Sequence, residues 1–292
     1  MQSTEGMLEA GAEPGSSGAT TADEHAVISE AALDEFDRWG VTTFDGPFTA
    51  RQLEAALRAF DGSPSIESWR PPSLGEDDGK GRYRAITSDP SDFAEPLLEI
   101  VSHPALEAIA GAVLRSTEVH ILKVTLVSSK PEPADSATYY SFHVDTQIQE
   151  SDFDASPRVG LTAAVWVWLS DVPSSCANLM VHRGSHRTLA QKLDTQCGLS
   201  TADNAELEQL RESGALGEPE PVIASAGQLT VVTTACLHRA SPNRSNAPRR
   251  LMIVTFGRVG ADGPRAENAA LRAMLPPQRR YLVQAPTPVA AL

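Results

Sequence analysis

The pattern of hydrophobic residues changes near residue 117, and this change constrains the fold more than any other feature of the chain. Before it, apolar residues recur with helical spacing over about 27–39, 49–60, 91–101 and 104–115. After it come β-branched, mostly alternating runs bounded by turn residues: EVHILKVTLVSS, RVGLTAAVWVWLSDV, GQLTVVTT and RLMIVTFGRV. We therefore predict a mainly β fold with flanking α-helices and a two-sheet jelly-roll core, that is, a double-stranded β-helix.

Shorter segments complete this prediction. VTTF, after the first helix, is a candidate strand, and residues 61–82 have the composition of a loop. The polar stretch 187–220 contains one predicted helix near 202–213, and another helix is predicted near 266–275. We expect the 61–82 loop and the 187–220 stretch to form a lid.

The net charge of −14 is unevenly distributed along the chain. Residues 1–37 carry nine acidic residues and no Lys or Arg, whereas the other 29 acidic residues face 24 basic ones. Residues 1–25, rich in Gly, Ser, Ala, Thr and Glu, are predicted to be a disordered acidic tail, and 26–292 a single domain. No basic stripe exists to meet phosphates, which argues against nucleic acid as a partner.

The remaining composition favours a cytoplasmic protein. Three unpatterned cysteines (Cys176, Cys197 and Cys236) fit a reducing compartment and lack zinc-site spacing. The N-terminus has no basic region followed by an apolar one, so it does not resemble a signal peptide. No apolar run approaches the ~18 residues needed to span a bilayer. We expect a monomer or homodimer that binds a small molecule, with no membrane or nucleic-acid partner.

Two histidines and one carboxylate form a candidate metal site. His143 and Asp145 are two residues apart in the extended-looking segment TYYSFHVDTQ, so on a strand both side chains project from one face. His238 follows the strand GQLTVVTTACL and can be brought over by sheet pairing. This ligand set suits Fe(II) with open coordination positions, although Zn(II) also accepts it. The arginine Arg249 offers a fixed cation for a carboxylate distant from the metal.

The sequence around these residues resembles the phytanoyl-CoA dioxygenase family of Fe(II)/2-oxoglutarate oxygenases. That family has an H-x-D motif, a distal histidine, a turn with Asn and Ser, and an arginine that enters a strand. CLHRASPNRSNAPRRLMIVTF follows this order, with Asn243 and Ser245 in the turn and Arg249 at the expected offset. WVWLSDVPSSCANLMVHRGSHR, AGQLTVVTTACLH and WGVTTFDGPFT match further family segments. The resemblance covers roughly residues 27–285 and implies a cupin-like jelly roll.

The sequence departs from the family pattern at three positions. Arg183 replaces the usual proline before Gly-Ser-His, and Gln228 replaces the aspartate after Gly227. The position two past the distal histidine, where the family often has a hydroxyl residue, is Ala240, so Ser241 is the remaining hydroxyl candidate for co-substrate binding. The metal carboxylate is present as Asp145. Related halogenases replace it with a small residue, so Asp145 argues against halogenation.

The resemblance implies Fe(II), 2-oxoglutarate and O2 as cofactor and co-substrates. His143, Asp145 and His238 would hold the metal, and Arg249 would pair with the far carboxylate of 2-oxoglutarate. Arg250 is the alternative, but strand neighbours face opposite sides, so only one of the two can enter the barrel. Both arginines being at the surface is the remaining possibility.

Trp166 is assigned by the same resemblance, and further candidates by their position beside the H-x-D segment. Trp166 is expected against the co-substrate, unless it is an ordinary core tryptophan. Gln147 continues the face of the metal ligands and is a candidate contact for substrate or co-substrate, with a solvent-facing glutamine as the favoured alternative. Tyr140, or its neighbour Tyr139, is expected to line the cavity, and His186 to fix its loop.

The function implied is oxidation of a C–H bond of a small molecule, with release of succinate and CO2. Hydroxylation is the default outcome, and a bacterial secondary metabolite is the expected substrate by analogy alone. Two alternatives remain open. One is a zinc hydrolase using the same His/Asp/His site, and the other is a non-catalytic jelly-roll binding module.

Overall fold

The structure is a computed structural model of the 292-residue chain. It describes residues 28–68, 83–87, 90–133, 141–145, 162–193, 209–258 and 271–283. The predicted acidic tail (1–25), Tyr139, Tyr140 and Gln147 lie outside these residues, as do most of the 61–82 loop and part of the 187–220 stretch.

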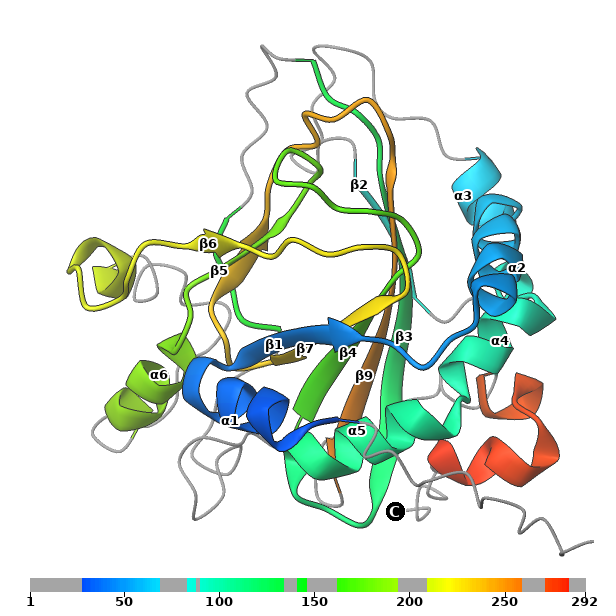
Figure 1. Cartoon of the computed structure of the whole chain (residues 1–292), viewed down its shortest axis with the longest axis horizontal. Coiled ribbons are helices and arrows are strands. Elements are labelled where there is room, and N and C mark those ends of the chain that lie inside the picture. Colours follow the sequence, from blue (N-terminus) through cyan, green and yellow to red (C-terminus); the bar gives the residue numbers. More distant parts are fainter. Residues whose placement is uncertain are drawn as a thin grey trace, which may run out of the picture.

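Among the described residues, helices predominate before residue 117 and strands after it, as the periodicity predicts (Figure 1). The helices are α1 (Glu30–Trp39), α2 (Ala50–Asp61), α3 (Pro64–Ser68), α4 (Glu95–Val101), α5 (Pro104–Leu114) and α6 (Ser185–Leu193), with 3-10 turns η1 (Pro90–Asp92) and η3 (Pro277–Leu282). Residues 209–212 and 271–274 are also helical, within the two predicted later helices.

Local sequence sets the ends of the first two long helices. The Ser29 hydroxyl accepts a hydrogen bond from the Ala32 N–H at the start of α1, and Gly40 ends the helix in the left-handed conformation at φ 74°. Thr49 and Gln52 form a reciprocal capping box at the start of α2. These caps fix where the chain leaves each helix, and Gly40 leads directly into the first strand.

The strands form two antiparallel sheets. They are β1 (Val41–Asp45), β2 (Tyr83–Thr87), β3 (Val119–Ser129), β4 (Thr162–Trp168), β5 (Leu179–Val181), β6 (Glu220–Pro221), β7 (Gln228–Thr233), β8 (His238–Ala240) and β9 (Arg249–Arg258). The larger sheet has the order β1-β7-β4-β9-β3-β2 and the smaller one β6-β5-β8. The predicted jelly roll is confirmed, but the sequence pattern missed β2 and the short strands of the smaller sheet.

Alternate residues of the larger sheet face two different surroundings. The face that carries Val165 and Val254 is called the outer face here. These two residues belong to a large apolar cluster shared with the helices. The inner face carries Trp166, Trp168 and Leu251, which pack with residues of the smaller sheet. Helices α2, α4 and α5 lie on the side of the larger sheet away from β5 and β6 (Figure 1).

One apolar segment corrects the sequence expectation about membrane spans. Glu95–Leu114 has the length and hydropathy of a membrane-crossing helix, with a mean hydropathy of 1.5. The segment is divided into α4 and α5 by Ser102 and His103, and its apolar side chains belong to the core cluster under the outer face. Its apolar character is therefore explained by packing within the protein.

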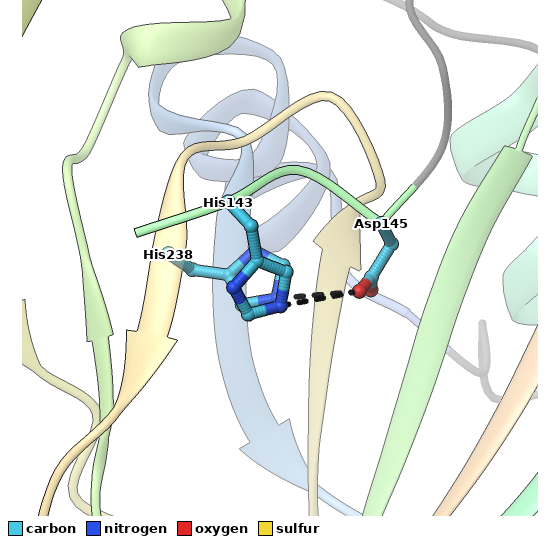
Figure 2. A group of neighbouring side chains, drawn as sticks. All are labelled: His143, Asp145 and His238. Carbon is cyan, nitrogen blue, oxygen red and sulfur yellow. Dashed lines mark ion pairs between the residues drawn. The ribbon is translucent and has the colours of Figure 1, made fainter. Parts of the chain in front are cut away.

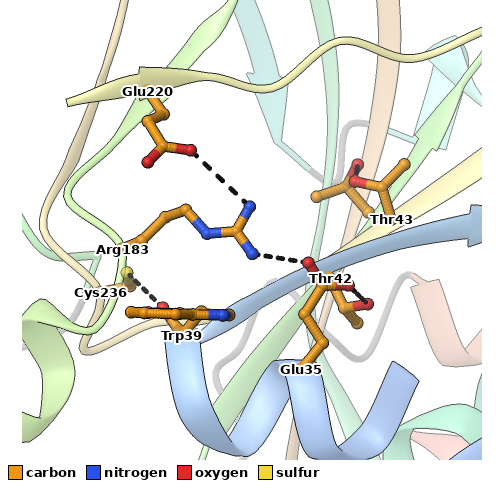
Figure 3. Close-up of polar contacts among 8 residues, drawn as sticks. Glu35, Trp39, Thr42, Thr43, Arg183, Glu220 and Cys236 are labelled. Carbon is orange, nitrogen blue, oxygen red and sulfur yellow. Dashed lines mark hydrogen bonds and ion pairs between the residues drawn. The ribbon is translucent and has the colours of Figure 1, made fainter. Parts of the chain in front are cut away.

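Arg183, which stands where the family usually has proline, joins the N-terminal helix to the smaller sheet (Figure 3). Its guanidinium lies 2.6 Å from a carboxylate oxygen of Glu35 in α1 and 3.9 Å from one of Glu220 in β6. It also lies over the ring of Trp39, 5.4 Å from the centroid. The Thr42 hydroxyl donates to the second Glu35 oxygen (2.8 Å). The substitution therefore adds a polar connection that proline cannot make.

The second departure, Gln228, is also accounted for locally. Its side-chain oxygen accepts from the Ser225 N–H (2.9 Å), and its amide nitrogen donates to Asp45 (3.0 Å). Gly227 precedes it with φ 89°, and a Cβ there would lie 2.6 Å from Leu53. The turn therefore needs glycine at 227, and the glutamine at 228 holds both sides of it.

Candidate metal centre

The two predicted histidines lie opposite each other on paired backbone segments. The N–H of His143 donates to the carbonyl of His238, and the N–H of His238 donates to the carbonyl of His143, both at 2.9 Å. The first segment is not a full strand as predicted, because His143 forms only an isolated bridge beside β8. The N–H of Asp145 donates to Thr234 (3.1 Å), which fixes the carboxylate residue beyond the end of β7.

The predicted alternation of this segment is confirmed. Phe142 and Val144 are buried in an apolar cluster with Leu237. His143 and Asp145 project from the opposite face, toward His238 (Figure 2). Burial of every second residue thus directs both ligand side chains to one point.

The three side chains form a cluster of metal-binding size (Figure 2). One ligand atom from each of His143, Asp145 and His238 lies within 4.8 Å of the others. Asp145 Oδ1 lies 3.5 Å from His238 Nε2 and 3.8 Å from His143 Nε2. His238 is buried, with a side chain 4% exposed, whereas those of His143 and Asp145 are 43% and 39% exposed. The cluster is therefore closed at His238 and open at the other two residues.

Backbone carbonyls determine which nitrogen of each imidazole faces the cluster. His143 Nδ1 lies 3.1 Å from the carbonyl of Ser141, and His238 Nδ1 lies 2.8 Å from that of Cys236. A carbonyl only accepts hydrogen bonds, so each Nδ1 carries the proton and each Nε2 keeps a free lone pair. Two such imidazoles and one carboxylate fit Fe(II), which favours this ligand set.

The pKa shifts of Asp145 and His143 favour metal binding, whereas that of His238 favours its protonated form while the neighbouring carboxylate is ionised. Burial acts to raise the pKa of Asp145. The opposing effects of His238, then of His143 and Lys123, are larger together and lower this pKa to about 2. Burial and the neighbouring His238 lower the pKa of His143. Burial also acts to lower the pKa of His238, but the Asp145 carboxylate outweighs it and raises the pKa. At neutral pH the cluster therefore offers an ionised carboxylate beside a neutral His143.

Trp166 lies against the cluster from the larger sheet. Its ring meets that of His238 edge-on, with centroids 6.3 Å apart. Its indole Nε1–H is buried and has no hydrogen-bond partner among the described residues. Trp168 faces the same way, but its Nε1–H donates to Thr230 (2.8 Å). Trp166 therefore has a donor left for a bound molecule, whereas Trp168 has a structural role.

Arg249 and Arg250 point in opposite directions. Arg249 is 1% exposed, lies on the inner face next to Ser129 of β3, and donates to the carbonyl of Ala177. Arg250 pairs with Asp61 at the end of α2 (Nε to Oδ1, 2.6 Å). Of these two arginines, Arg249 is therefore the one whose cation lies in the space between the sheets. The sequence could not indicate its contact with Ala177, because a backbone carbonyl leaves no signal in residue type.

The other predicted residues are placed as follows. Ser241 directly follows β8, and its N–H donates to Asn178 (2.9 Å). His186 is fully buried, and its Nε2 lies 3.3 Å from the carbonyl of Asp37 in α1, as expected for a residue that fixes its loop. Asn243 is buried and donates to Ser129 and Ala247 (both 2.9 Å), which shapes the turn before Arg249.

The sequence of this chain matches one known protein family. The profile of the family described as Phytanoyl-CoA dioxygenase (PhyH) matches residues 36–251. No curated protein matches the chain significantly.

Several solved structures share the fold. The carbocyclase SnoK from nogalamycin biosynthesis, described as non-heme and alpha ketoglutarate dependent, has a TM-score of 0.59 and 18% identity, covering 79% of this chain and 84% of its own. The epimerase SnoN in complex with Fe3+, alpha ketoglutarate and nogalamycin RO has a TM-score of 0.56 and 16% identity, covering 78% and 83%. HygX from Streptomyces hygroscopicus with nickel, 2-oxoglutarate and hygromycin B bound has a TM-score of 0.55 and 17% identity, covering 82% and 90%.

At these identities the structural likeness establishes the jelly-roll fold alone, whereas the sequence profile spans most of the chain. The members of this family are enzymes that use Fe(II), 2-oxoglutarate and O2. The chain belongs to the phytanoyl-CoA dioxygenase family, and it is an Fe(II)/2-oxoglutarate-dependent dioxygenase.

Proposed function

We propose that His143, Asp145 and His238 hold the Fe(II) ion and that the enzyme hydroxylates a C–H bond of a small molecule. The observation that carries this proposal is the convergence of two Nε2 lone pairs and one carboxylate within 4.8 Å, with both Nδ1 atoms occupied by backbone carbonyls. Asp145 would supply the carboxylate of this ligand set, which in Fe(II) enzymes leaves coordination positions open for other molecules.

Arg249 is the proposed anchor for the far carboxylate of 2-oxoglutarate. Ile253, which pairs with Trp166 beside His238, lies four positions after Arg249 along β9. At strand spacing this is about 13 Å. An arginine side chain and a bound 2-oxoglutarate together can span this distance. The guanidinium can pair with a carboxylate through two hydrogen bonds. Buried between the sheets, the pair would be shielded from water.

The remaining residues of the site would bind and orient the co-substrate and keep water out. Bound iron and 2-oxoglutarate supply the oxidising chemistry. Trp166 covers His238 and presents an unpaired N–H to the same space, so we assign it to co-substrate contact. Ser241 remains a candidate hydroxyl at the end of β8. The apolar residues of the inner face keep the space dry, which strengthens the charge interactions there.

We infer that the substrate is a small natural product of bacterial secondary metabolism. SnoN is described with nogalamycin RO bound, and HygX with hygromycin B bound. The site of this chain opens at His143 and Asp145, the side on which a substrate of such size can approach the metal. We place the enzyme in the cytoplasm, where 2-oxoglutarate is available, as a monomer or homodimer.

The direct test is succinate formation from 2-oxoglutarate by the purified protein. We expect succinate only when both Fe(II) and O2 are supplied, with a slow rate in the absence of substrate that rises when a substrate from a natural-product panel is added. Asp145→Ala should lower the rate by at least about 100-fold, because a metal ligand is lost. Glu54→Ala, on the exposed surface of α2, is the control with one carboxylate fewer.

Zinc-dependent hydrolysis without succinate would contradict the proposal, as would full succinate formation by Asp145→Ala. Failure to bind any divalent metal would instead favour a binding module without catalysis.

A further inference from the structure

The inner face of the larger sheet carries a second cation, at the end opposite Arg249. The register across β4, β9 and β3 aligns Trp166 with Ile253 and Thr125. The next inward-facing row is Ala164, Thr255 and Lys123.

A β-bulge brings Lys123 to this face. The register of β3 against β9 shifts between Ile121 and Lys123, so that Ile121 pairs with Phe256 and Lys123 with Thr255. Ile121 and Phe256 both lie in the outer apolar cluster, and paired residues share a face, so Lys123 points inward. Without the extra residue, the lysine would point toward the helices.

Lys123 also lies near the open side of the metal site. The N–H of Asp145 is bound at Thr234, whose hydroxyl contacts that of Thr162 at the start of β4, one row beyond Ala164. The lysine is exposed and forms no salt bridge with any described residue.

The two inward cations are too far apart to serve one carboxylate. Thr255, the partner of Lys123, lies six positions after Arg249 along β9, which corresponds to about 20 Å. Along β9, the position of Ile253, which pairs with Trp166 beside His238, lies between these two cations. Arg249 is buried, whereas Lys123 is open to molecules that arrive from solvent.

We propose that Lys123 is a specificity residue that binds an oxyanion of the substrate, a carboxylate or a phosphate, on the side of the metal site away from Arg249. This inference rests on the proposed function, because it takes the Arg249 end as the place of the co-substrate. The neighbours of Lys123 in its row, Ala164 and Thr255, are small and uncharged, so they leave room for the acidic group beside the ammonium. An oxyanion in this space gains a charge-assisted hydrogen bond that a neutral group does not.

The test uses the full chain loaded with Mn(II) and saturating 2-oxoglutarate under anaerobic conditions. The probes are benzoate and phenyl phosphate, each with a neutral counterpart, benzamide and phenol. Broadening of the probe's ring protons in NMR spectra reports binding close to the paramagnetic ion. At least one acid should bind about tenfold more tightly than its counterpart, and the acid that does so distinguishes carboxylate from phosphate recognition.

Lys123→Gln should abolish this preference, and Lys123→Arg should keep it. The matched control is Arg58→Gln, which removes a cation from the exposed surface of α2. Equal binding of acids and neutral probes by the wild type would overturn the proposal, as would an acid preference that survives in Lys123→Gln. A lysine that only supported the Asp145 carboxylate would change Mn(II) affinity in Lys123→Gln and leave the probe preference intact, which would also overturn it.

The 2-oxoglutarate affinity of Lys123→Gln, measured in parallel, should remain within about twofold of the wild type. A loss as large as that of Arg249→Ala would make Lys123 a co-substrate ligand and contradict the proposal. Failure of the proposed function would be seen separately, as the absence of any 2-oxoglutarate complex with Fe(II) in the wild type. Saturation-transfer NMR on the metal-free protein measures the Lys123-dependent acid preference even in that case.

Discussion

The two faces of the larger sheet are built from the same strands but have different compositions. In β4, Ala163, Val165 and Val167 face outward into the cluster covered by helices. Ala164, Trp166 and Trp168 face inward. The outward positions are apolar throughout β4, whereas the inner face also contains buried polar groups such as Thr230 and Arg249. Burying polar groups is costly unless they are bonded, which indicates that the inner face is shaped by binding and the outer face by stability.

Arg249 and Arg250 are adjacent in β9 and show the same difference between the two faces. Arg249 is 1% exposed, at the inner face, while the Arg250 side chain is 23% exposed and paired with Asp61. Residue type is identical and only the face differs. Predictions about the two faces can therefore be made with closely matched variants.

The largest expected effect is a loss of stability from the outer face. Phe256 in β9 is fully buried in the outer cluster, so Phe256→Ala should reduce the free energy of unfolding by about 3–5 kcal/mol. Urea denaturation measures this loss, and Phe256→Leu should show a smaller one. In the protein that remains folded, 2-oxoglutarate affinity should hold within about twofold. Weakened co-substrate binding at unchanged stability would break the distinction between the faces.

The next effect is on binding, at the inner face. Arg249→Ala should weaken 2-oxoglutarate binding by about 100-fold or more, because a buried bidentate charge pair is lost. Arg250→Ala should change it by less than about threefold. Isothermal titration with the metal-loaded protein compares the two variants, and circular dichroism checks that both are folded. Similar losses in both would mean that the face of the strand does not decide co-substrate binding.

A smaller effect is expected in the turn that leads to Arg249. The buried Asn243 amide donates to Ser129 and Ala247, and its oxygen accepts from the Ser245 N–H (3.0 Å). Asn243→Ala should cost about 1–3 kcal/mol of stability, since buried carbonyls lose their donors. Because Ser129 pairs with Arg249, 2-oxoglutarate affinity should also fall by a few-fold. Unchanged stability and affinity together would contradict this role.

Sequence patterns predicted much of the fold and the metal site for identifiable reasons. The change from helical to alternating periodicity indicated helices before strands, and burial of Phe142 and Val144 follows the predicted alternation. His143, Asp145 and His238 were predicted as ligands because their residue types and order resemble a known family, and the structure brings the three side chains together.

Other features depend on pairing that residue types do not encode. The inward direction of Lys123 follows from a bulge in β3, which no local pattern in EVHILKVTLVSS indicates. Trp166 and Trp168 share a face, and only their distances to His238 and Thr230 separate their roles. The strands β5 and β8 have three residues each, too few for a periodic signal.

The smallest expected effect concerns the two buried cysteines, Cys176 and Cys236. Burial raises the pKa of the Cys236 thiol to about 11, so it remains protonated and unreactive at pH 8. In a Cys197→Ser background, a thiol reagent should modify Cys176 and Cys236 slowly in the native protein and quickly in urea. Rapid native modification would show that solvent reaches these thiols in the folded protein.

The most direct test of the central claim is an anaerobic titration of the metal-free protein with Fe(II) and 2-oxoglutarate, followed by visible absorption. The wild-type protein should show the weak charge-transfer band of an iron–2-oxoglutarate chelate at one equivalent of each. The band should be lost in His238→Ala and absent when Zn(II) replaces Fe(II). Absence of the band in the wild type, or its persistence in His238→Ala, would contradict the assignment of this face as the site of iron and co-substrate binding.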